Sequence, residues 1–182
     1  MDKDHDQALV DGFRNGDRSA FATLVKRYQQ PVYNAAYRVL GNADDAADIA
    51  QTVFLKVAER LDGYDPRFKF FSWLYRIAIN ESINLLRRNG RDVPLEDEEN
   101  LPGSDGADPA WQLGEAQVSR RVQGALMGMK ADDRVVITLR HFSECSYREI
   151  GLILDLDEKT VKSRLFEARG RLKGLLKDLR DN

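Results

Sequence analysis

Apolar residues recur every three or four positions along most of the chain, whereas alternation with a period of two is absent over any useful length. This spacing places apolar side chains on one face of a helix, so the pattern predicts an all-α protein. Candidate N-terminal caps are Asp17 or Ser19, Asn42 or Asp44, and Ser72. A first helical domain is predicted over residues 1–92, with helices over 5–15, 17–29, from Pro31 to Gly41, over 43–61, and from near Phe70–Ser72 to Arg88.

Helical spacing returns after residue 115 and predicts a second helical domain over residues 116–182. Its helices are expected over 116–130, from Asp132 or Asp133 to Phe142, over 147–154, and from Asp157 or Thr160 to about Leu179. Val135, Val136, Leu139 and Phe142 form the expected apolar side of the second of these helices.

Ser146 and Glu149 have the spacing of a capping box. Gly151 lies inside the short helix that follows, where glycine costs about 1 kcal/mol relative to alanine. Gly151 therefore indicates a close approach of the next helix.

Residues 93–115 contain three prolines, three glycines and no periodic apolar stripe. We interpret this stretch as a flexible acidic linker between the two helical domains. At about 3.3 Å per residue, its 23 residues reach at most roughly 75 Å.

Charge is unevenly distributed, although the net charge of the 182 residues is only −2. Residues 92–115 hold eight acids and no lysine or arginine, whereas residues 159–177 hold seven bases and one acid. Residues 67–91 hold six bases and one acid. Two basic segments on either side of an acidic one suggest nucleic acid as a partner.

The absence of long apolar runs and the single cysteine indicate the cellular compartment of the protein. No run of about 18 apolar residues is present, and the N-terminus is polar and acidic, so neither a membrane span nor a signal peptide is expected. The single Cys145 allows no internal disulfide. Both observations favour a cytoplasmic protein without membrane insertion.

One stripe of the helix over 70–88 carries a ring, amides and guanidinium groups: Trp73, Arg76, Asn80, Asn84 and Arg87. A cluster of aromatic residues accompanies it, formed by Tyr64, Phe68, Phe70, Phe71 and Trp73. Single-stranded nucleic acid is bound by such combinations of stacking surfaces and cations. The alternative is ordinary, because a tryptophan on an amphipathic helix is usually part of the core and a charged stripe is usually only solvated.

Residues 146–169 have the layout of a helix-turn-helix: a short helix, a tight turn and a longer basic helix. Val161 and Leu165 would seat the second helix, which leaves Lys159, Lys162, Ser163, Phe166, Glu167 and Arg169 facing outward. Such side chains can contact phosphates and bases in a major groove. A helical hairpin with an ordinary charged face is the alternative.

No motif for catalysis or for a cofactor is present. The chain has no GxxxxGK[ST] phosphate loop and no GxGxxG unit. His141 and Cys145 could offer two metal ligands, but a zinc site needs three or four. We therefore expect no enzyme activity, no cofactor and no metal.

Three segments together resemble bacterial sigma factors of the sigma-70 family, in particular the extracytoplasmic-function group (group IV), which has only regions 2 and 4. DDAADIAQTVFLKV resembles that family's DAEDLVQETFLKA signature. FFSWLYRIAINESINLLRR resembles F-x-x-WLYRIA-x-N followed by a pair of arginines, and SYREIGLILDLDEKTVKSRLFEARGRL resembles SYEEIA…TVKSRL-x-RAR-x-x-L. The resemblance covers residues from about 9 to 176.

The resemblance implies a function in promoter-specific initiation of transcription. Region 2 would melt and read the −10 element through Tyr64, Phe68, Lys69, Phe70, Trp73, Arg76, Asn80, Arg87 and Arg88. Region 4 would read the −35 element through Lys159, Lys162, Ser163, Arg164, Phe166, Glu167 and Arg169. Core RNA polymerase, through the clamp helices of its largest subunit, would bind Asp45, Asp48, Gln51, Phe54 and Leu55. The polymerase flap and an anti-sigma factor are further implied partners.

Two positions depart from the family pattern. Ala47 stands where an acid is usual, so one polar contact to polymerase is expected to be missing. Glu167 stands where arginine or a neutral residue is frequent, and a glutamate can accept a hydrogen bond from cytosine N4. We therefore expect an altered −35 preference.

A stand-alone helix-turn-helix regulator is the alternative function. Such a protein would bind duplex DNA without polymerase, and would have no use for the aromatic stretch 64–73.

Overall fold

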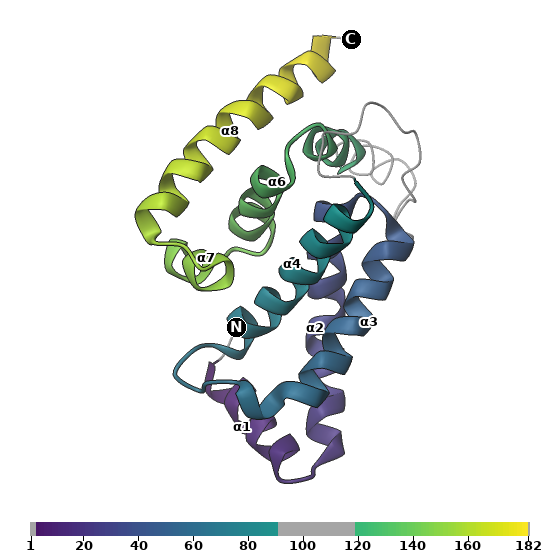
Figure 1. Ribbon diagram of the computed structural model, residues 1–182, viewed down its shortest axis with the longest axis vertical. Coiled ribbons are helices and arrows are strands. Elements are labelled where there is room, and N and C mark those ends of the chain that lie inside the picture. Colours follow the sequence, from purple (N-terminus) through teal and green to yellow (C-terminus); the bar gives the residue numbers. More distant parts are fainter. Residues whose placement is uncertain (1–2, 91–118, 182) are drawn as a thin grey trace, which may run out of the picture.

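The first half of the chain forms a bundle of four helices and one short 3-10 turn (Figure 1). The computed structural model describes the backbone of residues 3–90 and 119–181, and the side chains of 5–90 and 119–177. Helix α2 packs against α1, α3 and α4, and its apolar side chains meet those of its neighbours in a common core. The elements are α1 (Lys3–Arg14), α2 (Arg18–Leu40), α3 (Ala43–Arg60), η1 (Leu61–Gly63) and α4 (Phe70–Arg88).

The second half begins with helical residues 119–127 and continues into a helix-turn-helix. Helix α8 packs against both α6 and α7, and it lies on the outside of the molecule (Figure 1). Its elements are α6 (Ala131–Ile137), the π-helical turn η2 (Thr138–Phe142), α7 (Tyr147–Leu154) and α8 (Glu158–Asp181). The predicted linker 93–115 lies outside the described residues.

Helix α2 runs through Pro31 without a break, whereas the sequence predicted two helices that meet there. A proline inside a helix costs about 3 kcal/mol, because it removes a hydrogen bond and crowds the preceding turn. Tyr28, Val32, Ala35 and Val39 are all fully or almost fully buried on one stripe that spans the proline. Burial of this stripe requires one continuous helix and offsets the cost of the proline.

Two expected caps are wrong, and both corrections follow from burial. Helix α4 begins at Phe70, and Ser72 lies buried within its first turn, because Phe70 and Phe71 enter the core. Helix α6 begins at Ala131, with Lys130 in the cap position, and Asp133 instead pairs with Arg171 of α8.

The other caps are confirmed. Asp17 accepts from the amides of Ser19 and Ala20, Asn42 from that of Asp45, and Asp157 from that of Thr160. The amide and the hydroxyl of Thr160 both donate to the Asp157 carboxylate, and these two bonds lower its pKa, together with a weaker bond from the amide of Lys159. Ser146 and Glu149 form the reciprocal capping box that the sequence predicted.

Gly151 is required by close packing, but its neighbour is the turn rather than the second helix. A Cβ atom at this position would lie 2.6 Å from the carbonyl oxygen of Leu156. The amide of Leu156 also donates to the carbonyl of Gly151 at 2.9 Å, so the turn is folded back on the helix.

Replacing Gly151 with alanine should therefore destabilise the protein by about 1–2 kcal/mol, because the overlap with a backbone atom outweighs the better helix propensity of alanine. Gly174→Ala is the matched control, since a Cβ there meets nothing within 4 Å in the same half of the molecule. It should raise stability by up to about 1 kcal/mol. Urea unfolding measures both, and equal stabilisation by the two variants would refute the packing argument.

The two halves contact each other through α4 with α7, and through α2 with α6 and η2. Lys69 Nζ lies 2.7 Å from Glu149 Oε1, and Gln123 Nε2 donates to the carbonyl of Tyr37 at 3.1 Å. The guanidinium of Arg38 lies 4.2 Å from the centre of the Phe142 ring. Phe142 is thus partly exposed and stacked by an arginine, whereas the sequence predicted a core position. Helix α7 lies between α4 and α8 (Figure 1).

Candidate nucleic-acid interface

The outer stripe of α4 combines polar groups with one aromatic ring. Arg76, Asn80, Asn84 and Arg87 are exposed and Trp73 is half-buried. The helix presents these residues because Leu74, Ala78 and Ile79 enter the core on its other side. Arg88, at the end of the helix, is exposed as well. This surface can accept unpaired bases beside a guanidinium and an amide.

Tyr64 and Phe70 do not offer free faces for stacking, in contrast to the sequence-based expectation. They are only 3% and 1% exposed, because their rings pack against each other and against Trp73. The ring centroids of Tyr64 and Phe70 are 5.6 Å apart, and they lie 5.5 and 5.9 Å from that of Trp73. Burial raises the pKa of Tyr64, whose hydroxyl donates to the carbonyl of Phe68 at 2.8 Å. Tyr64 and Phe70 therefore support Trp73 from below, and Phe68 is the ring of this loop that reaches solvent.

Arg14 holds the loop that precedes α4, and sequence reasoning missed it. Its Nη2 donates to the carbonyl oxygens of Leu61 and Tyr64, both at 2.9 Å. The arginine is at the end of α1, 47 and 50 residues before its partners. No local pattern indicates such a contact.

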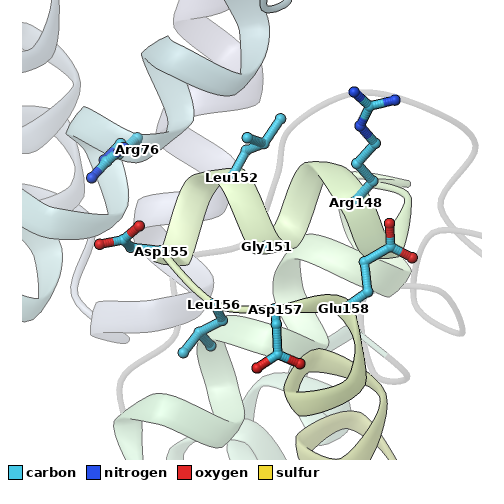
Figure 2. Close-up of a pocket in the computed structure, with 8 residues that line it drawn as sticks. All are labelled: Arg76, Arg148, Gly151, Leu152, Asp155, Leu156, Asp157 and Glu158. Atoms are coloured by element: carbon cyan, nitrogen blue, oxygen red, sulfur yellow. The ribbon is translucent and has the colours of Figure 1, made fainter.

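A pocket lies where α4 meets α7 (Figure 2). Arg76 enters it from α4, and Asp155 lies opposite at the end of α7. Lys69, another predicted DNA contact, is paired with Glu149 beside this boundary. In this arrangement α7 therefore shields part of the basic surface of α4. The lining residues are Arg76, Arg148, Gly151, Leu152, Asp155, Leu156, Asp157 and Glu158.

Helix α8 has the two faces that a recognition helix needs. Val161, Leu165 and Ala168 are buried against α6 and α7, and Phe166 is 79% exposed on the opposite side. The other predicted −35 contacts are also exposed: Lys159, Lys162, Ser163, Arg164, Glu167 and Arg169.

Two of the arginines in α8 are tied to neighbouring elements. Arg169 Nε donates to His141 Nε2 at 3.1 Å, and burial together with Arg169 and Arg140 lowers the pKa of His141. The lowered pKa keeps the imidazole neutral and able to accept this bond. Arg171, which the sequence analysis did not single out, pairs with Asp133 and Glu167.

The predicted polymerase-binding residues of α3 divide into two groups. Asp48, Gln51 and Leu55 are exposed on one face, and Leu55 is 59% exposed although it is apolar. Asp45 is half-buried in the first turn, whereas Phe54 packs into the core. Phe54 can therefore support this face by packing beneath it, but its ring is not free to contact a partner.

Three further features of the described residues concern metal binding, membranes and the one thiol. Over the described residues, no three His, Cys, Asp or Glu side chains gather where they could hold a metal ion. Among these same residues, no helix is both long and apolar enough to cross a membrane. Burial raises the pKa of Cys145 to about 12, so its thiol is protonated at neutral pH.

Two family models match the two halves of the chain. Sigma-70 region 2 matches residues 24–92, and Sigma-70 region 4 matches residues 119–172. The first match contains α4 and its aromatic loop, and the second contains the helix-turn-helix. The two modules define an RNA polymerase sigma factor of the sigma-70 family.

Individual relatives narrow this class. The ECF RNA polymerase sigma factor SigW of Bacillus subtilis (strain 168) is 35% identical over 91% of this chain and 94% of its own length. The ECF RNA polymerase sigma-E factor of Escherichia coli (strain K12) is also 35% identical, over 90% of each chain. The chain belongs to the extracytoplasmic-function (ECF) sigma factors.

Solved structures agree with this assignment. CnrH, in complex with the cytosolic domain of CnrY, superposes with a TM-score of 0.71 at 26% identity, over 96% of this chain and 98% of CnrH. The sigma factor RpoE from Bartonella quintana, in complex with the anti-sigma factor NepR, superposes with a TM-score of 0.69 at 25% identity. That match covers 86% of this chain and 96% of RpoE.

Proposed function

We propose that this chain binds core RNA polymerase and directs initiation at promoters, with α4 opening and reading the −10 element and α8 reading the −35 element. One observation carries the proposal: a single chain presents both an aromatic, amide-bearing and basic surface on α4 and an exposed basic recognition helix. Unpaired bases need the first surface, and a duplex major groove needs the second.

In the proposed −10 site, Trp73 and Phe68 offer ring surface, and Asn80 and Arg76 contact base edges or phosphates. Lys69, Arg87 and Arg88 contribute positive charge, and Tyr64 and Phe70 support the site from the core. In the −35 site, Phe166 and Ser163 face the groove, and Lys159, Lys162, Arg164 and Arg169 lie where they can meet phosphates. Asp48, Gln51 and Leu55 form the proposed contact with the polymerase clamp, and Asp45 lies at its edge.

Simultaneous binding of both elements requires the halves to separate. The −10 and −35 elements lie roughly 55–60 Å apart at about 3.4 Å per base pair. Helices α4 and α7 are in direct contact here, and Lys69 is paired with Glu149 across that contact. Polymerase binding would therefore have to break the α4–α7 contact before α4 can meet single-stranded DNA.

We also propose an anti-sigma factor as a partner, because the similar sigma factor RpoE was solved in complex with the anti-sigma factor NepR. Such a partner would bind the surfaces that polymerase uses. The proposed site of action is the cytoplasm, where bacterial polymerase and promoter DNA are found. The function needs no catalytic group in the chain.

The test is in vitro transcription with core polymerase on a genomic promoter library, paired with a band-shift assay of the same promoters. The expected result is promoter-specific transcripts only when both proteins are present, and weak binding of duplex DNA by the chain alone. Tight, specific binding of duplex DNA without polymerase, and no transcripts with it, would instead establish the helix-turn-helix regulator.

A further inference from the structure

A network of three charged side chains links α6 to the recognition helix α8. Arg171 Nη1 donates to Asp133 Oδ2 at 2.6 Å, and Arg171 Nη2 donates to Glu167 Oε2 at 3.0 Å. The side chain of Asp133 is only 11% exposed, whereas those of Arg171 and Glu167 are about half exposed. Asp133, at one end of this network, is thus nearly buried. Glu167, at the other end, is next to Phe166 on the surface that would face DNA.

Asp133 holds the guanidinium of Arg171 in one position. A nearly buried carboxylate is costly unless a cation and hydrogen bonds accompany it, so the pairing with Arg171 is strongly favoured. The guanidinium is planar and presents its donors in a fixed fork. Once one side of the fork bonds Asp133, its other side is directed at residue 167, one turn earlier on α8.

The consequence is a carboxylate held in place at the edge of the recognition helix. Glu167 accepts hydrogen bonds but cannot donate them, and DNA phosphates repel it. The exposed donors in a major groove are the amino groups of cytosine N4 and adenine N6. A carboxylate that is already oriented loses less conformational entropy on binding than a free glutamate does, so it discriminates better between bases.

We propose that Arg171, anchored by Asp133, is a positioning residue that directs Glu167 at a base amino group in the −35 element. This inference rests on the proposed function of α8. The competing role for Arg171 is a direct phosphate contact, but both arms of its guanidinium are already bonded to carboxylates within the protein.

The experiment selects −35 sequences from a randomised library with the full-length chain in holoenzyme. Wild type should prefer cytosine or adenine at one position by roughly ten-fold, within the range of one good side-chain contact to a base. Glu167→Gln should change that preference. Arg171→Gln and Asp133→Asn should weaken it to about three-fold or less at the same position, and Arg171→Gln added to Glu167→Gln should have no further effect.

Two further variants keep the result interpretable. Arg171→Lys retains a charge for Asp133 but lacks the fork that reaches both carboxylates, so it should keep the thermal stability of wild type and lose the preference. Lys173→Gln removes another exposed positively charged side chain from α8 and should weaken binding of all DNA sequences equally.

Three outcomes would count against specific parts of the argument. If Arg171→Gln and Arg171→Lys keep the full preference, the positioning role is wrong. If Arg171→Gln weakens all sequences equally and makes the salt dependence shallower by about one phosphate contact, Arg171 binds DNA directly and the inference is also wrong. If wild-type holoenzyme selects no −35 sequence at all, the proposed function itself fails.

Discussion

Replacing Trp73 and Asn80 together with alanine should abolish promoter opening and leave the binding of core polymerase unchanged. Trp73 is the half-buried ring on the outer stripe of α4, and Asn80 is an exposed amide two turns further along. Stacking of one base on an aromatic side chain contributes about 1–3 kcal/mol. With the loss of an amide contact to a base edge, open complexes should decrease by roughly 100-fold or more.

The measurement is the fluorescence of 2-aminopurine placed in the −10 element, recorded during mixing with holoenzyme. Phe13→Ala combined with Gln29→Ala is the matched control, because it also removes one half-buried ring and one exposed amide, but from α1 and α2. The control should open the promoter as wild type does. Normal opening by the Trp73 and Asn80 variant would exclude this stripe as the melting surface.

Replacing Leu55 with aspartate should weaken binding of core polymerase by roughly 30-fold or more, with little change in the stability of the free protein. Leu55 is a large apolar side chain that is 59% exposed on α3, next to exposed Gln51 and Asp48. A few central contacts of an interface contribute about 2 kcal/mol or more each, and a carboxylate placed among them would be desolvated without a partner.

Fluorescence anisotropy of the labelled chain, titrated with core polymerase, gives this affinity, and thermal unfolding gives the stability. Ala22→Asp introduces the same charge at an exposed position of α2 and should leave the affinity within about two-fold of wild type. If Leu55→Asp and Ala22→Asp bind polymerase equally well, this face of α3 does not contribute to the contact.

The sequence predicted the local features of the candidate site well. The stripe from Trp73 to Arg87 follows from helical periodicity, and the Ser146–Glu149 capping box follows from residues three positions apart. The exposed face of α8 could be found in the same way, because Val161 and Leu165 mark the side that is buried. Each of these signals depends on residues within a few turns of one another.

Features that depend on burial were less predictable. Tyr64 and Phe70 carry the composition of a stacking platform, and only their packing against Trp73 identifies them as its support. Pro31 has a strong local preference for a helix start, which the buried stripe of α2 overrides. A sequence pattern states which side chains are apolar, but it does not state how much apolar surface each will lose to its neighbours.

The amino-acid sequence by itself therefore determined the helical class, most of the helices, the helix-turn-helix and the residue types of both candidate DNA surfaces. Only the tertiary structure decided that Lys69 pairs with Glu149, that Arg14 holds the loop before α4, and that Asp133 anchors Arg171. Helix formation and capping are set by interactions between residues a few positions apart, so the sequence contains them directly. The three pairings join residues 80, 47 and 38 positions apart, and they exist only once packing brings their helices together.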